Sequence, residues 1–214
     1  MIAGSSTHHR PTLLVDPIDH LLVDLATGRH LTGDTVHADE LAGEHDLDST
    51  QADDVLQAAW CLGLVSRPSA RSAVITWTPE VSQVQLHRLA RAMVAAVGTV
   101  TTRDPYGVAV IDGEEARLGA AELFELETPC DVDLFLELAR ALLSRRSIAV
   151  VDELVSPLSI LFSRVALEVH GVRLAATDAV RAEIVRGLVL SLMDGRVDDF
   201  RDLVADYVVA MSID

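Results

Sequence analysis

Residues 48–65 read DSTQADDVLQAAWCLGLV, and this stretch decides the fold of the chain. Asp48 or Ser49 is suited to cap the start of a helix. Small and aliphatic side chains then recur at the spacing of one helical face. They are Ala52, Val55, Leu56 and Ala59. Gly63 is expected to end the helix, since glycine is common just past a helix C-terminus. The stretch therefore predicts one amphipathic helix with a sharp end.

Shorter elements flank this helix on both sides. Upstream, residues 17–27 carry a helical apolar stripe and residues 38–44 form a second, short helix. Downstream, residues 64–66 and 73–77 favour β-structure and are joined by a polar turn, as in a hairpin. Three helices followed by a hairpin are the order of a winged helix-turn-helix. We therefore expect a winged-helix domain over residues 12–77.

The rest of the chain has the pattern of an antiparallel helical bundle, which we expect over residues 80–214. Its clearest apolar stripe contains Val132, Phe135, Leu136, Ala139, Leu142 and Leu143. The fold class is therefore mainly α, with an N-terminal winged helix-turn-helix and a C-terminal helical bundle.

Residues 98–130 are the least regular part of this second domain. A loop with a short strand at residues 108–111 is expected within residues 98–113, because glycine and proline interrupt the apolar pattern there. A helix is expected over residues 114–127. Farther on, a long helix over residues 148–170 should kink or break near Pro157.

Composition sets limits on the location and on the partners. The chain has 214 residues, which allows one large domain or two small ones. Its 33 carboxylates outweigh 17 basic residues, all arginine, and the net charge of −16 disfavours non-specific binding to polyanions. No apolar run reaches the roughly 18 residues of a membrane span, and the first residues lack a secretory pattern. We expect a cytoplasmic protein with no membrane contact.

The N-terminal part resembles the DNA-binding domain of GntR-type transcription regulators. In that family a helix ends in glycine, a second glycine follows five residues on, and a spaced apolar residue and Leu-Ala come next. The matching residues here are Gly28, Gly33, Val36, Leu41 and Ala42, then the helix 48–56 and Gly63-Leu64-Val65.

The C-terminal part is similar to the all-helical effector domain of the FadR branch. Asp133-Leu-Phe135 and the helix pair within residues 183–208 carry this similarity. The resemblance implies a homodimer that binds a palindromic operator on double-stranded DNA. It also implies that the operator is released when a small-molecule effector binds.

The helix that would read DNA is acidic, unlike that of the family. Where relatives typically present arginines, the chain has Ser49 and Asp53, and no arginine lies within residues 46–60. A carboxylate cannot make the double hydrogen bond that arginine makes to guanine, and phosphate repels it. The carboxylates either form a solvated first turn or face the DNA, and in both cases the usual basic reading of DNA is missing. The DNA-binding candidates are Ser49, Thr50, Gln51, Arg67 and Arg71, and binding is expected to be weak or atypical.

Candidate effector-binding residues lie in the second domain. Arg88 and Arg91, on the first bundle helix, are suited to bind an effector carboxylate, although both also fit as surface arginines. Asp133 and Tyr207 are further candidates, because the resemblance aligns them with metal-binding positions of the family.

No metal site and no cofactor are expected. Leu136 and Val185 stand at or near positions where the resembling family has histidine, and one carboxylate does not hold a transition metal. The histidines within residues 1–45 are scattered, with no pair on one convincing helix face.

The sequence has no catalytic motif, so no enzyme is expected. The leading interpretation is a dimeric, effector-responsive DNA-binding regulator. The alternative is an interaction protein that keeps the fold but has lost operator reading and acts through protein partners. The acidic helix favours this alternative.

Overall fold

The computed structural model describes residues 17–103, 109–111, 130–143, 155 and 157–213. These residues are mainly helical, as the sequence predicts. The N-terminal part contains α1 (Pro17–Ala26), β1 (Thr35–His37), α2 (Ala38–His45), α3 (Ser49–Cys61) and β2 (Ser72–Val74). The C-terminal part contains α4 (Pro79–Val100), β3 (Thr101–Arg103), β4 (Ala109–Ile111), α6 (Asp131–Leu143), α8 (Arg164–Val169), α9 (Asp178–Met193) and α10 (Val197–Ala210).

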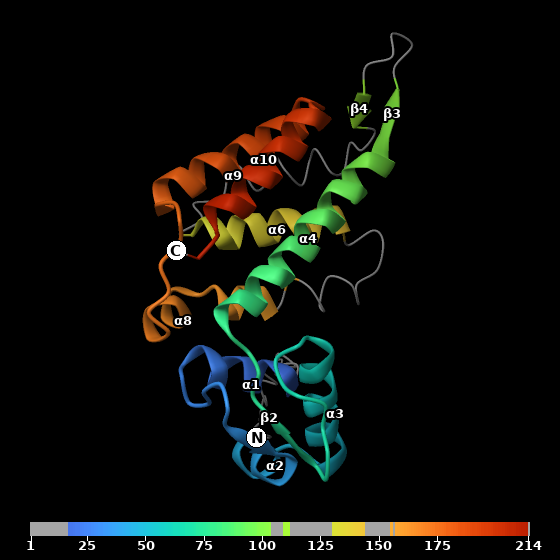
Figure 1. The fold of residues 1–214 in the computed structure, drawn as a ribbon. Coiled ribbons are helices and arrows are strands. Elements are labelled where there is room, and N and C mark those ends of the chain that lie inside the picture. The colour runs from blue at the N-terminus through green and yellow to red at the C-terminus, as the bar shows by residue number, and fades with distance from the viewer. Residues whose placement is uncertain (1–16, 104–108, 112–129, 144–154, 156, 214) are drawn as a thin grey trace, which may run out of the picture.

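Figure 1 shows these two parts one above the other. The helices α1, α2 and α3 form the lower part, and α4 runs from its upper edge along the bundle of α6, α9 and α10. α10 packs against α9 and α4, while α6 packs against α4 and α9. Among the described helices none is long and apolar enough to cross a membrane.

The recognition helix α3 starts and ends as its sequence predicts. Of the two candidate caps, Asp48 is the one used, and its carboxylate accepts hydrogen bonds from the backbone N–H groups of Thr50 and Gln51, each at 2.8 Å. Such a cap stabilises a helix by about 1 kcal/mol. Gly63 follows the helix with φ of +75°, a conformation that costs glycine little.

The hairpin is present, but it includes a strand that the sequence did not predict. β1 pairs with β2 in antiparallel register, with Val36 opposite Ala73. The predicted pairing survives as single bridges between Val65 and Ile75 and between Ser69 and Ser72. A strand of three residues is too short to show an alternating apolar pattern in the sequence. β1 is therefore recognised only by its pairing with β2.

The short strand expected at residues 108–111 is present as β4, but the loop expected before it is not fully irregular. The helix α4 continues to Val100, and β3 pairs with β4 in antiparallel register, with Thr101 opposite Ile111. Residues 157–161 are helical, and the described chain leaves the helix at residues 162–163. The expected kink or break near Pro157 stays a prediction, because residues 144–154 and 156 lie outside the described residues. Ser163 then caps α8 by accepting from the N–H of Ala166 at 3.3 Å. The helix expected over residues 114–127 lies outside the described residues.

Each part has its own hydrophobic core. The lower core includes Leu21, Leu22, Leu25, Leu41, Leu56, Leu64 and Ile75, and Leu161 joins it from the second part. In the upper core, the stacked rings of Phe135 and Tyr207 lie 4.2 Å apart among Leu89, Met93, Leu188 and Phe200. The division into domains at 12–77 and 80–214 stays a prediction, with which these two cores are consistent.

Specific contacts join the two parts. The Gln85 side chain donates to the backbone oxygen of Leu62 at 2.6 Å. His170 stands at the C-cap of α8, and its Nε2 donates to the backbone oxygen of Leu25 at 2.7 Å. The edge of the Trp77 ring contacts the same imidazole.

Candidate functional site

The N-terminal turn of α3 is exposed, as a DNA-reading surface requires. Ser49, Thr50 and Gln51 all lie on the surface there. The side-chain oxygen of Gln51 accepts from the backbone N–H of Asp48 at 2.9 Å, which completes a capping box. Contact between Gln51 and a base would therefore have to come from its amide nitrogen.

Arg71, at the wing tip, is folded back onto the recognition helix. Its Nε donates to Asp53 Oδ1 at 3.0 Å, and one terminal nitrogen donates to the backbone oxygen of Ser49 at 3.3 Å. The other terminal nitrogen lies 3.0 Å from Asp39 Oδ1. The hydrogen bond to Asp53 is the main reason that the pKa of Arg71 is raised. The wing arginine is thus neutralised within the protein itself.

The sequence placed Asp53 and Arg71 on the same surface but could not show that they pair. They are 18 residues apart and belong to different elements. Backbone geometry brings them together, because Ala70 and Arg71 adopt φ of +51° and +60° and turn the wing tip sharply. No short-range sequence pattern indicates a pair between residues this far apart.

Arg67, on the other arm of the hairpin, has a different environment. Its guanidinium lies over the ring of Trp60, 5.8 Å from the centroid, in a cation–π contact. Trp60 is itself 39% exposed near the end of α3. The aromatic ring does not compensate the positive charge of Arg67, whereas two carboxylates compensate that of Arg71. Arg67 is therefore better placed than Arg71 to contact a phosphate.

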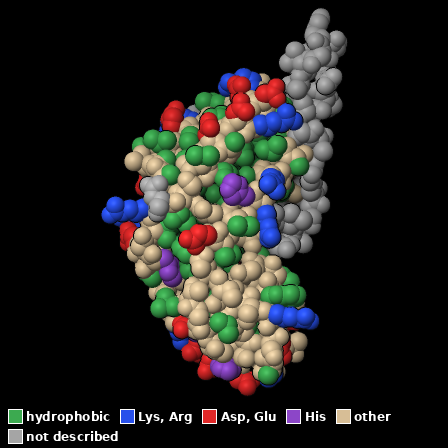
Figure 2. Space-filling model, in the orientation of Figure 1, with side chains coloured by type: hydrophobic (Ala, Val, Ile, Leu, Met, Phe, Trp, Pro, Cys, Tyr) green, Lys and Arg blue, Asp and Glu red, His purple; other side chains and the backbone are tan. Residues whose placement is uncertain are grey.

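The surroundings of α3 are acidic as well. Figure 2 shows acidic side chains gathered at the lower end of the molecule, where Figure 1 places α2. α2 contributes Asp39, Glu40 and Glu44, and exposed Asp53 and Asp54 follow on α3. This charge opposes the approach of a phosphate backbone.

The four predicted effector-binding residues do not form one site. Arg88 and Arg91 are exposed on α4, and Arg91 borders an apolar groove between α4 and α10. Tyr207 is fully buried on α10, whereas Asp133 is exposed on α6. The buried carboxylate of α6 is Asp131. Asp133 points away from it, because residues two positions apart in a helix face nearly opposite directions.

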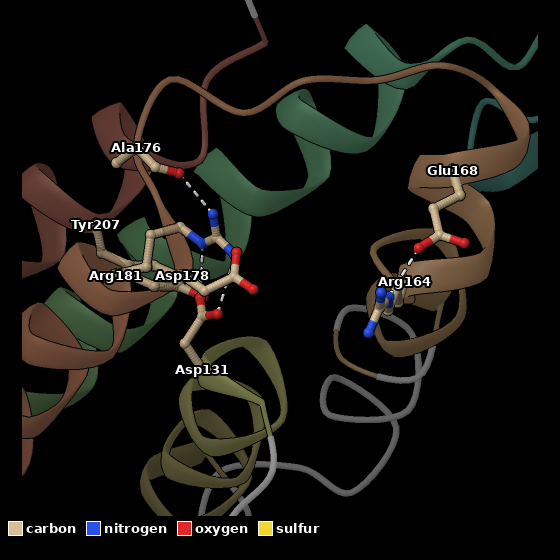
Figure 3. A network of polar contacts seen from close by, with 7 residues as sticks. All are labelled: Asp131, Arg164, Glu168, Ala176, Asp178, Arg181 and Tyr207. Atoms are coloured by element: carbon tan, nitrogen blue, oxygen red, sulfur yellow. Dashed lines mark hydrogen bonds and ion pairs between the residues drawn. The ribbon is translucent and has the colours of Figure 1, made fainter.

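Asp131 forms a buried polar network with Arg181 and Tyr207 (Figure 3). Arg181 donates to both carboxylate oxygens, from Nε at 2.8 Å and from a terminal nitrogen at 3.0 Å. The Tyr207 hydroxyl donates to Asp131 Oδ2 at 3.0 Å. Arg181 also donates to the backbone oxygen of Ala176 and to Asp178. α6, α9 and α10 are therefore tied together by one ion pair.

Burial controls the protonation of this network. Burial, followed by the charge of Asp131, raises the pKa of Tyr207 well above its ordinary value, so the phenol stays protonated and donates. Burial alone lowers the pKa of Arg181, but its hydrogen bonds and charge interactions with Asp131 and Asp178 outweigh that effect and raise it. Arg181 is consequently charged at neutral pH.

A cavity of about 670 Å³ opens beside this network. Asp131 and Arg181 line one side, and α8 lines the other with Arg164, Leu167 and Glu168. Arg164 donates to Glu168 at 2.7 Å, a contact that raises the pKa of the arginine. The cavity thus combines an apolar wall with two arginines that are each held by a carboxylate.

The positions aligned with metal-binding histidines hold none. Leu136, Val185 and Tyr207 are all buried in the upper core. Among the described residues, the one group of three whose side chains are close enough to share an ion is Asp24, His30 and Glu44, in the winged-helix part. Sequence reasoning missed this group, because its members are 6 and 14 residues apart and match no ligand spacing.

No family model matches the sequence, and no significant match is found among curated proteins. Solved structures do match. McbR/YncC of E. coli is 15% identical with a TM-score of 0.52, and the match covers 90% of this chain and 91% of that one. Lar, which controls expression of the Listeria monocytogenes agr system, is 12% identical with a TM-score of 0.50, with 91% and 92% covered.

A further match is a structure described as a putative transcriptional regulator GntR from Rhodococcus sp. RHA1. It is 16% identical with a TM-score of 0.47, over 89% of this chain and 91% of that one. At these identities the likeness concerns the fold. McbR/YncC and Lar are GntR-family regulators, and the chain therefore has the fold of that family: a winged helix-turn-helix followed by a helical domain.

Proposed function

We propose that this protein is a dimeric, DNA-binding transcription regulator of the GntR type that responds to a small molecule, and not an enzyme. The observation that carries the proposal is the architecture itself. A capped, exposed recognition helix lies beside a wing, and α4 connects this unit to a bundle with a ligand-sized cavity. The FadR branch and a cytoplasmic location are part of the proposal.

DNA reading in this proposal is weak or atypical. Arg71 must leave Asp53 and Asp39 before it can contact a phosphate, and few other cations surround α3. Arg67, Thr50 and Gln51 then carry most of the contact. Few phosphate contacts produce a shallow dependence of affinity on salt, because the slope scales with their number.

The effector in this proposal binds in the cavity beside Asp131 and Arg181. Its volume of about 670 Å³ lies within the range of about 300–1,000 Å³ typical of small-molecule sites. An effector carboxylate can replace Glu168 on Arg164, whose side chain is 90% exposed, at little cost. This assignment moves the effector site away from Arg88, Arg91 and Asp133.

The groove between α4 and α10 is proposed to bind a second copy of this chain. It holds about 460 Å³ and is lined mainly by valine and alanine, with Val209 67% exposed. A homodimer places two winged helices together, as a palindromic operator requires. Arg91 and Arg201 line the same groove.

The test is selection of duplexes from a random pool at low salt, with the full chain. We expect a palindrome to be enriched, and fluorescence anisotropy on it to show weaker binding by Arg67→Ala. Light scattering should give a dimer at micromolar concentration. If no sequence is enriched, or if the protein stays a monomer of 23.1 kDa, the proposal is wrong.

One observation favours the alternative function of a protein-interaction module. The pairing of Arg71 with Asp53 and Asp39 removes the wing cation from the DNA-facing surface. If wild type binds no duplex and Asp53→Arg gains binding, the fold is competent but its reading has been lost. That result would favour the interaction module over the regulator.

A further inference from the structure

Asp24, His30 and Glu44 form a cluster that the proposed function does not use. They lie at the ends of α1 and α2, and one ligand atom from each lies within 4.8 Å of the other two. Asp24 is 5% exposed, His30 is half-buried and Glu44 is exposed. One wall of the cluster is therefore fixed in the core, while the opposite wall is free to adjust.

The local backbone explains why these residues meet. The turn after α1 passes through Gly28 at φ +72°. The backbone N–H groups of Arg29 and His30 donate back to the backbone oxygen of Asp24 at 2.9 and 3.4 Å. This turn returns His30 to the end of α1. Glu44 belongs to the last turn of α2, which lies alongside.

His30 supplies an observation that is independent of the carboxylates. Its Nε2 atom is buried and has no hydrogen-bond partner. Buried polar atoms are nearly always paired, and an exception calls for a partner such as an ion. A ring nitrogen of the same imidazole lies within 4.8 Å of an oxygen of both carboxylates, a set of groups that suits a cation.

Asp24 is already oriented for such a role. Its Oδ2 accepts from His45 Nε2 at 2.9 Å, and the His45 ring stacks on His20. A carboxylate held by an outer partner is typical of metal ligands. Its Oδ1 faces a terminal nitrogen of Arg29 at 3.4 Å, a long contact.

Arg29 occupies the place of a displaceable cation. Its second terminal nitrogen lies 2.8 Å from Glu44 Oε1, so one guanidinium bridges both carboxylates. The side chain of Arg29 is 49% exposed and can swing into solvent. The bridge offsets the negative charge of the cluster until another cation arrives.

We propose that Asp24, His30 and Glu44 bind one zinc ion, which displaces the guanidinium of Arg29. One imidazole and two carboxylates suit zinc, with water in the fourth position, whereas calcium and magnesium prefer oxygen ligands throughout. Zinc bonds of about 2.0–2.2 Å require a small closing movement. The exposed Glu44 side chain can make it.

The ion would clamp the end of α1 to α2, the helix that precedes the recognition helix. Binding to the folded state alone stabilises it, so zinc would rigidify the DNA-binding domain. This site replaces our sequence-based expectation of no metal, in which the histidines were scattered. The proposal does not depend on DNA binding and is tested without DNA.

The experiment is calorimetric titration of zinc chloride into the full chain, with cobalt absorption as a second readout. We expect one ion per chain. Loss of a residue that only supports a metal ligand weakens metal binding about 10- to 100-fold. His30→Gln removes a ligand itself and should weaken zinc binding by more than that. His37→Gln is the matched control, because this histidine is exposed in the same domain and lies outside the cluster.

Arg29→Gln should tighten binding, a gain that misfolding cannot imitate. Circular dichroism checks that each variant is folded. The double variant His8→Ala/His9→Ala should bind as wild type does, since these adjacent histidines could capture zinc themselves. The proposal is overturned if wild type binds no zinc, if His30→Gln binds equally well, or if the double variant loses the ion.

Discussion

Two arginine–carboxylate pairs, one in the bundle and one on the winged helix, use the same chemistry in opposite environments. In the bundle, the side chains of Arg181 and Asp131 are 6% and 3% exposed. On the winged helix, those of Arg71 and Asp53 are 42% and 48% exposed. The two pairs have similar distances, so burial is what distinguishes them.

Burial decides whether such a pair is structural or exchangeable. Both members of the bundle pair are almost entirely shielded from water, so each depends on the other. The surface pair contributes little to stability, and solvent or phosphate can replace either partner. We therefore expect the first pair to hold the fold together and the second to control access to DNA.

The largest effect is expected from Asp131→Ala. This change leaves a buried guanidinium without its main partner, and the free energy of unfolding should fall by about 3–5 kcal/mol. Asp133→Ala, two residues away and exposed, is the control and should change it by less than about 0.5 kcal/mol. Urea denaturation measures both. Equal losses in the two variants would show that burial of a carboxylate on α6 does not decide how much it stabilises the fold.

The next effect concerns DNA affinity. Asp53→Arg releases Arg71 and adds a guanine-reading group, so duplex binding should tighten by about 1–3 kcal/mol. Asp54→Arg makes the same charge change without releasing Arg71, and its gain should be smaller. Anisotropy at two salt concentrations measures both. Tight, steeply salt-dependent wild-type binding that Asp53→Arg abolishes would mean that the carboxylate reads a base itself.

Tyr207→Phe tests the third member of the bundle network. It removes one hydrogen bond to Asp131 and should lower the free energy of unfolding by about 1 kcal/mol near neutral pH. The pH dependence has a definite sign. Because the native pKa of Tyr207 is raised, its contribution is present below the unfolded value of about 10 and is lost as pH rises through the native pKa.

The Phe variant should therefore lose less stability than wild type in alkaline solution. Tyr106→Phe is the control, since the chain has two tyrosines. Phenolate absorbance of the Tyr106→Phe protein should appear only as it unfolds. A normal titration of Tyr207 in the folded protein would contradict the burial argument.

The smallest effect is expected from Asp53→Asn on stability. The pair with Arg71 is exposed, so the free energy of unfolding should change by no more than about 1 kcal/mol. Thermal unfolding with and without added salt measures it. A loss as large as that of Asp131→Ala would mean that the wing is part of the folded core.

Sequence reasoning was reliable where neighbouring residues determine the structure. The cap at Asp48 and the helix end at Gly63 depend on a few adjacent residues, and the model reproduces both. The pairs Asp53–Arg71 and Asp131–Arg181 span 18 and 50 residues, and their partners meet only after folding. Asp131 was not among the candidates for the same reason, since the side of α6 that faces Arg181 depends on the packing of α9.

The close contact between Gly28 and α8 has a mechanical consequence. A Cβ added at Gly28 would lie 2.8 Å from Val169 Cγ1, so there is no clearance between the two parts at this point. Arg164 and Glu168, earlier on α8, form the cavity wall. In the proposed dimer, a rotation of that short helix would push on the turn after α1 through this contact. The spacing of the two recognition helices would then change whenever the proposed effector prefers one position of α8.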